Sequence, residues 1–293
     1  MAVLRPLSET LTQARADLPE GQPVLRVNEL NLHFAGIVAL RDVSFDVGQQ
    51  ELFAIIGPNG AGKTSLFNCL SGLYRPQKGS IEFLTHQLVG MKPDHIARLG
   101  MARTFQNIEL FHNLTVLDNL MLGRHLHMGY GTFSALAYAG RARRNEVGQR
   151  RVIEEIIDFL EIQPYRKLPV GLLPFGIKKR VELGRALAME PTLLLLDEPV
   201  SGMNVEETGD MARFILDIRE ELDIAIILVE HDMGLVMDLA DRVLALDFGI
   251  PIAMGAPAEI QENPDVIRAY LGEEHGRREG AGATAPRSDG GGT

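Results

Sequence analysis

Hydrophobic and polar residues alternate along two segments near the start of the chain. Residues 24–34 and 43–47 repeat with the two-residue period of half-buried strands, and we expect them to form a small antiparallel sheet. Residues 52–56 (LFAII) are instead continuously apolar and stop at a glycine-rich turn, after which residues 63–70 show a helical pattern. This order predicts the strand, loop and helix of a buried parallel-sheet unit.

The middle of the chain changes character, because helical patterns dominate it and predict a helical insertion over about 93–170. These patterns cover 93–99, 115–126 and 147–160. Strand-like apolar runs return after the insertion, separated by amphipathic helices. The runs are 193–196, 224–229 and 243–246, and the helices are 206–222 and 233–239. Strands that alternate with helices predict a parallel, doubly wound sheet.

Both ends of the chain lack the periodicity of the central part. We expect one folded domain over 24–272, preceded by an N-terminal extension over 1–23 to which no function is assigned. Residues 273–293 hold six glycines and no Leu, Ile, Val or Phe. A segment with so little apolar surface cannot offset the entropy cost of ordering, so we predict a disordered C-terminal tail.

Charge and composition exclude several classes of protein. The 293 residues include 29 Lys and Arg against 39 Asp and Glu, a formal net charge of −10, which argues against a dedicated nucleic-acid binder with its basic surface. The longest apolar run, 224–229, is far shorter than the roughly 20 residues that cross a bilayer. Residues 1–20 show no apolar region of a signal peptide. The single cysteine, Cys69, fits a reducing cytoplasm.

A glycine-rich loop lies between the buried strand and the helix that follows it. Residues 57–64 (GPNGAGKT) match the pattern G-x-x-x-x-G-K-[ST], whose glycines let backbone N–H groups point inward at phosphate oxygens. We expect Lys63 to neutralise the β- and γ-phosphates and stabilise transition-state charge, Thr64 to ligate Mg²⁺, and Ser65 to donate to a neighbouring phosphate. The positions of this predicted nucleotide site are Gly57, Pro58, Asn59, Gly60, Ala61, Gly62, Lys63, Thr64 and Ser65.

Two carboxylates follow a second buried strand. Residues 193–196 (LLLL) lead directly into Asp197 and Glu198, and ligands of doubly wound sheets bind at the carboxyl ends of the strands. We expect Asp197 to hold Mg²⁺ and Glu198 to orient or deprotonate an attacking water. Taken alone, an Asp-Glu pair after a strand is more often the start of a helix. Paired with the phosphate loop, it indicates nucleotide hydrolysis.

These motifs, and four more in the same order, resemble those of the nucleotide-binding subunits of ABC transporters over about residues 24–271. Residues 104–106 (TFQ) stand where that family has its glutamine loop, and residues 201–204 (SGMN) where its D-loop follows the carboxylates. His231 matches the switch histidine, and Phe34 the aromatic residue that stacks on adenine. The resemblance implies an α/β P-loop NTPase fold, with a RecA-like doubly wound parallel core, an antiparallel β subdomain and a helical subdomain.

The resemblance also implies ATP and Mg²⁺ as cofactors and a role for each matching residue. Thr64, Asp197 and Gln106 would hold the metal. Glu198 would act as base toward the attacking water, while His231 would contact the γ-phosphate and position that water. Gln106 would also link the metal site to the helical subdomain, and hence to a transport partner.

The signature segment departs from the family pattern. The common form is LSGGQ, and the aligned residues 173–177 read LPFGI, so Pro174 replaces the serine that would reach the γ-phosphate of the opposite subunit. Gly176 remains, and residues 178–187 continue as an amphipathic helix whose N-terminus still presents N–H groups and a positive dipole to a phosphate. We expect the lost hydroxyl to weaken or make asymmetric one of two composite sites. A homodimer and a heterodimer with a paralogous ATPase both remain open.

The L-P-F-G form, with residues 105–111, 114–120 and 255–260, is similar to the ATPases of branched-chain amino-acid importers. This implies a peripheral subunit on the cytoplasmic face of the bacterial inner membrane. Its partners would be a second ATPase subunit, two membrane permease subunits and, indirectly, a periplasmic or extracellular substrate-binding protein, with no nucleic acid. Urea and short-amide importers share much of this architecture. They and importers of other amino acids stay open as alternatives, because an ATPase subunit does not touch the transported substrate.

Two hypotheses from other classes find no support in the sequence. A soluble ABC ATPase of DNA repair or translation usually carries a long coiled-coil insertion or two fused cassettes, and this sequence has neither. A nucleotide-binding scaffold without hydrolysis would be supported if Glu198 were missing, and it is present. ATP hydrolysis coupled to transport is therefore the predicted function.

Overall fold

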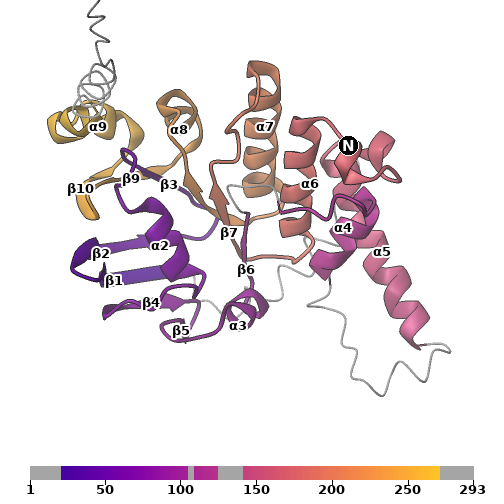
Figure 1. Cartoon of the computed structure of the whole chain (residues 1–293), viewed down its shortest axis with the longest axis horizontal. Helices are drawn as coiled ribbons and strands as arrows, with labels where there is room; N and C mark the ends of the chain where they lie inside the picture. Colours follow the sequence, from indigo (N-terminus) through magenta and orange to yellow (C-terminus); the bar gives the residue numbers. More distant parts are fainter. Residues whose placement is uncertain (1–20, 105–108, 125–140, 271–293) are drawn as a thin grey trace, which may run out of the picture.

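The computed structural model describes residues 21–104, 109–124 and 141–270, and its strands form two sheets (Figure 1). The smaller sheet has four strands in the order β2-β1-β4-β5, and all its neighbouring strands are antiparallel. These strands are β1 (Leu25–Phe34), β2 (Ile37–Val47), β4 (Lys78–Phe83) and β5 (His86–Gln87). The expected antiparallel subdomain is thus confirmed, and β4 and β5 extend it beyond the two strands predicted.

The larger sheet has six strands in the order β10-β9-β3-β8-β7-β6. They are β3 (Leu52–Ile56), β6 (Met101–Arg103), β7 (Leu193–Asp197), β8 (Ala225–Val229), β9 (Arg242–Asp247) and β10 (Ile250–Gly255). The strands from β9 to β6 run parallel, while β10 pairs antiparallel with β9 at the edge. The predicted parallel core is therefore confirmed.

Burial on both faces of the sheet explains why its central strands are continuously apolar. Every residue of β3, β7 and β8 is buried. Along β7 the side chains alternate between two cores: Leu194 and Leu196 pack into one, and Leu193 and Leu195 into the other. A strand covered on both faces has no polar face to preserve, so the two-residue alternation disappears.

The helices flank the parallel sheet, and α4 (Val116–Gly123), α5 (Arg141–Phe159) and α6 (Phe175–Leu187) lie at the end of the molecule away from the antiparallel sheet (Figure 1). Further helices are α2 (Lys63–Leu70), α3 (Pro93–Arg98), α7 (Val205–Glu221), α8 (Met233–Leu239) and α9 (Pro257–Gln261). Helix α4 contacts both α5 and α6. The interval 93–170 is not helical throughout, because β6 lies within it and joins the parallel sheet beside β7.

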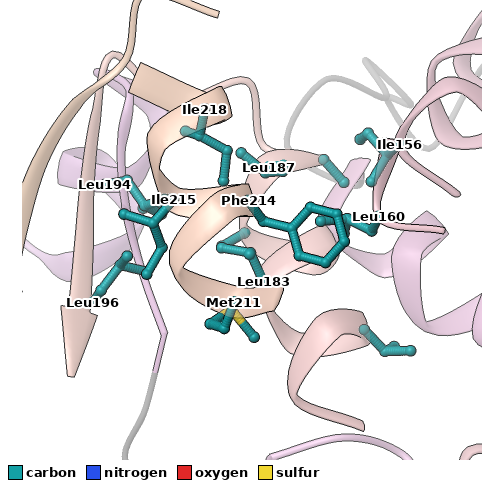
Figure 2. Close-up of a cluster of buried hydrophobic side chains, with 14 of the residues drawn as sticks. Ile156, Leu160, Leu183, Leu187, Leu194, Leu196, Met211, Phe214, Ile215 and Ile218 are labelled. Atoms are coloured by element: carbon teal, nitrogen blue, oxygen red, sulfur yellow. The ribbon is translucent and has the colours of Figure 1, made fainter. Parts of the chain in front are cut away.

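Helix α7 packs between the helices α5 and α6 and the parallel sheet. Its buried positions Met211, Phe214, Ile215 and Ile218 follow the spacing of one helix face. Figure 2 shows Phe214 pointing toward side chains of α5 and α6, whereas Ile215 lies against the leucines of β7. Helix α7 therefore packs between α5 and α6 on one side and β7, the strand that ends at Asp197, on the other.

Capping boxes fix where α7 and α4 begin. The Asn204 side chain accepts the backbone N–H of Glu207, and the Glu207 carboxylate accepts the N–H of Asn204, at the start of α7. Thr115 and Asp118 form the same capping box at the start of α4. Over the described residues, we find no helix with the length and apolar character needed to span a membrane.

Candidate functional site

The predicted phosphate loop connects β3 to α2, and its shape depends on glycine. Gly57, Gly60 and Gly62 have φ values of 149°, 82° and 100°, which L-side chains rarely adopt. A Cβ atom on Gly57 would stand 2.2 Å from the carbonyl oxygen of Leu246, and one on Gly62 would stand 2.6 Å from that of Ala39. The loop therefore curls tightly against its neighbours only because these side chains are absent.

The ammonium of Lys63 lies inside the curve of this loop. The side chain is 6% exposed, and Nζ donates hydrogen bonds to the carbonyl oxygens of Gly57 (2.5 Å) and Pro58 (3.1 Å). A pocket of about 380 Å³ opens beside it. Its lining residues are Ile37, Val38, Ala39, Asn59, Gly60, Ala61, Gly62, Lys63, Thr64, Ser65 and Glu198. The predicted phosphate loop and one predicted carboxylate thus line a single pocket.

The two carboxylates lie at the carboxyl end of β7. Glu198 adopts a positive φ of 50°, and its N–H donates to the carbonyl oxygen of Val229 at the end of β8. This bond ties the loops after the two adjacent strands together. It brings Nε2 of His231 to 2.6 Å from Oε1 of Glu198, so the structure joins two residues that are 33 positions apart in the sequence, from 198 to 231.

Asp197, the other carboxylate, is 3% exposed and forms an ion pair with Arg103. Nη2 of Arg103 lies 2.9 Å from Oδ2 of Asp197, and Nη1 donates to Oδ1 of Asn68 and Oγ of Ser71. Sequence reasoning missed Arg103, because a lone arginine in a three-residue strand gives no local signal.

A third carboxylate, Glu230, binds the backbone of the two loops that carry Glu198 and His231. It is buried and accepts hydrogen bonds from the backbone N–H groups of Val200 (3.2 Å) and His231 (3.1 Å). Burial raises the pKa of its carboxyl group, and these two accepted hydrogen bonds oppose the rise. Glu230 thus joins the loop after β7 to the loop after β8, another role that sequence reasoning missed.

The departing signature segment lies at the start of α6. Pro174 is the N-cap residue of this helix, and no side chain caps it. Gly176 is buried in its first turn, where a Cβ atom would stand 2.4 Å from Oε1 of Glu207, a member of the α7 capping box. Gly176 therefore leaves room for the Glu207 side chain that caps α7, which is a packing reason for glycine at this position.

Comparison with known proteins decides the family. The model of the ABC transporter family matches residues 40–201, and the model described as "Branched-chain amino acid ATP-binding cassette transporter" matches residues 251–276. This chain belongs to the ABC transporter ATP-binding cassettes. Members of this family hydrolyse ATP to power transport, so the expected fold and enzyme class are confirmed.

Relatives and solved structures of ABC cassettes cover most of the chain. It is 40% identical over 255 residues to the high-affinity branched-chain amino acid transport ATP-binding protein LivG of Salmonella typhimurium, covering 86% of this chain and 99% of LivG. It is 37% identical over 252 residues to BraF of Pseudomonas aeruginosa, covering 86% and 99% of the two chains. An ABC cassette in its ADP conformation superposes with a TM-score of 0.75 at 27% identity, covering 86% and 99%.

The aromatic residue expected to stack on adenine in an ABC cassette lies near the pocket without lining it. Phe34 ends β1, is 45% exposed, and meets Tyr74 edge-to-face with ring centroids 5.1 Å apart. The residues of the neighbouring strand β2 that line the pocket are Ile37, Val38 and Ala39. Stacking on adenine by Phe34 stays a prediction.

The donors available for Mg²⁺ in this cassette are oxygen atoms, which fit a hard cation. The Thr64 residue lines the pocket, and Asp197 lies at the end of β7 with Oδ2 held by Arg103. Gln106, the third predicted ligand, lies outside the described residues. The chemistry of the described donors is thus compatible with the metal that the family requires.

Proposed function

We propose that this protein is the ATP-binding and hydrolysing subunit of an importer of branched-chain amino acids. The observation that carries the substrate class is the match of residues 251–276 to the branched-chain amino acid cassette model. The 40% identity to LivG over 99% of its length supports the same assignment. Hydrolysis is supported by the pocket in which the phosphate loop faces Glu198.

The site residues would divide the work of hydrolysis between binding and proton transfer. Backbone N–H groups of the phosphate loop and the ammonium of Lys63 bind the phosphates and stabilise charge that develops on them. The oxygen of a water molecule attacks the γ-phosphorus, its proton passes to the carboxylate of Glu198, and ADP leaves. His231, with Nε2 at 2.6 Å from Glu198, orients that carboxylate and reaches toward the γ-phosphate.

Magnesium would be held by Thr64, Asp197 and Gln106. When bound, it neutralises charge on the β- and γ-phosphates. Phe34 would stack on the adenine, and Gly176 with the N-terminus of α6 would approach the phosphate bound by a second ATPase subunit. Exposed apolar side chains of Leu172, Phe175 and Val205 lie around that helix start and support a contact with this subunit.

The membrane partners are two permease subunits, to which this protein binds at the cytoplasmic face of the bacterial inner membrane and which work with an external substrate-binding protein. A mostly apolar cavity of about 230 Å³ supports such a contact. It lies between α3 and α6, and its walls include Pro93, Ile96, Met101, Ala186 and Met189. Apolar walls of this kind favour an apolar segment of a membrane subunit.

The experiment that tests the substrate class uses the complex of this protein with its permeases and a panel of ligand-loaded binding proteins. We expect ATP hydrolysis to rise with leucine, isoleucine or valine. Stimulation by urea or short amides alone would assign the protein to that class of importer, and ATP hydrolysis indifferent to every binding protein and permease would favour a non-transport ATPase.

A further inference from the structure

Arg103 joins three structural elements at the edge of the nucleotide site. It ends β6, it pairs with Asp197 at the end of β7, and it donates to Asn68 and Ser71 at the carboxyl end of α2. Helix α2 is the helix that begins at the phosphate loop. The guanidinium therefore bridges the phosphate-loop helix and the strand that carries the predicted metal ligand.

The pair between Arg103 and Asp197 is almost completely withdrawn from water. The two side chains are 9% and 3% exposed, and their closest atoms are 2.9 Å apart. The Arg103 guanidinium also lies 5.4 Å from the centre of the Phe67 ring, which restricts it from one face. A buried carboxylate without such a partner would be strongly disfavoured, so Asp197 depends on Arg103 for its position.

The backbone around this pair strengthens the link. The N–H of Thr104 donates to the carbonyl oxygen of Leu195 (2.9 Å), and β6 pairs with β7 in parallel register. Arg103 is thus held beside β7, and it binds Asp197, the last residue of that strand. Nη2 of Arg103 donates to Oδ2 of Asp197, which holds this carboxylate oxygen in place.

We propose that Arg103 is a positioning residue for ATP hydrolysis, which holds Asp197 in the orientation that binds the metal. This inference rests on the proposed ATPase function. This role does not require Arg103 to contact the nucleotide. Arg103 acts through Asp197, and its hydrogen bonds to Asn68 and Ser71 hold the metal ligand at a fixed position relative to the phosphate loop.

The test is the Mg²⁺ dependence of ATP hydrolysis by the full chain in complex with its permeases. We expect Arg103→Met to raise the Mg²⁺ concentration for half-maximal activity by about tenfold or more, the scale of a lost hydrogen bond to a charged group. Arg103→Lys, which keeps the charge but not the planar fork, restores part of this shift. Binding of ATP in the absence of metal stays as in the wild type, because the phosphate loop is untouched.

Two further variants keep the test decisive. Arg151→Met removes an exposed arginine from α5 and should leave the Mg²⁺ dependence unchanged. Asn68→Ala removes an anchor of the guanidinium without burying an unpaired charge, so it serves if Arg103→Met fails to fold, and we expect a shift of about two- to threefold in the same direction. Unchanged Mg²⁺ dependence in a folded Arg103→Met protein, or in Asn68→Ala if only that variant folds, overturns the inference. Absence of hydrolysis by the wild-type complex would instead refute the proposed function.

Discussion

Replacing Glu198 by glutamine is the most specific perturbation of the proposed chemistry. The substitution replaces one carboxylate oxygen by an NH₂ group of nearly the same size, which turns the carboxylate into a neutral amide. The backbone at this position is held independently, because its N–H donates to Val229. The Gln side chain therefore occupies the same place beside His231 but cannot accept a proton from water.

The expected magnitude follows from the role of a general base. Positioned general bases accelerate reactions by about 100- to 10,000-fold, which corresponds to about 2.7–5.4 kcal/mol of transition-state stabilisation. ATP affinity should change little, because most of the pocket lining comes from 59–65 and the start of β2. Glu198→Gln therefore separates turnover from binding.

The assay combines steady-state phosphate release with equilibrium ATP binding on the same preparation. We expect turnover to fall by at least about a hundredfold while ATP stays bound, so that the closed dimer accumulates. Glu220→Gln, an exposed change on α7, is the matched control and should behave as wild type. Turnover of Glu198→Gln within about threefold of wild type, at unchanged ATP affinity, would refute the assignment of the base.

Three other predictions test separate parts of the structure. Tyr270→Phe removes the hydroxyl that accepts the N–H of Gly57 at 2.9 Å, and urea denaturation should show about 1 kcal/mol less stability; equal stability would contradict a role for this bond. Burial raises the pKa of the Cys69 thiol to about 12, so at pH 8 only about one thiol in ten thousand is ionised, and a disulfide reagent should label native protein far more slowly than unfolded protein. Phe214→Ala should lower the free energy of unfolding by about 3–5 kcal/mol, whereas Phe248→Ala, at a site 77% exposed, should not.

The parallel core was predictable because both of its faces are buried. Continuous apolar runs such as 52–56 and 193–196 marked β3 and β7; the first run ended at Gly57 of the phosphate loop and the second at the charged residue Asp197. The helix after the phosphate loop was predicted with its actual bounds, since Gly62 and the loop before it define its start.

The antiparallel sheet was harder to delimit from the sequence. Strand β2 begins at Ile37, in a region with no clean alternation, and its pairing with β1 contains register shifts. Glu29 and Asp42 have positive φ values there. At each irregularity the side chains that follow switch between the two faces of the sheet, so a two-residue period does not persist along the strand.

The supporting contacts of the site were not predictable from local pattern. Strand β6 has only three residues, and the role of Arg103 depends on its ion pair with Asp197, a residue 94 positions later. Glu230 has a similar dependence on the loop after β7. The motifs located the groups that face the nucleotide, whereas the groups that hold them in place appear only when distant strands become neighbours.

The central claim is that hydrolysis of ATP by this chain powers the uptake of branched-chain amino acids. The most direct measurement is leucine uptake by proteoliposomes that contain the permeases and this protein, with ATP on the side of the ATPase and a leucine-loaded binding protein on the other. We predict uptake that requires ATP and is lost with Glu198→Gln. Leucine uptake that continues without ATP, or no leucine uptake while another substrate is imported, would contradict the account.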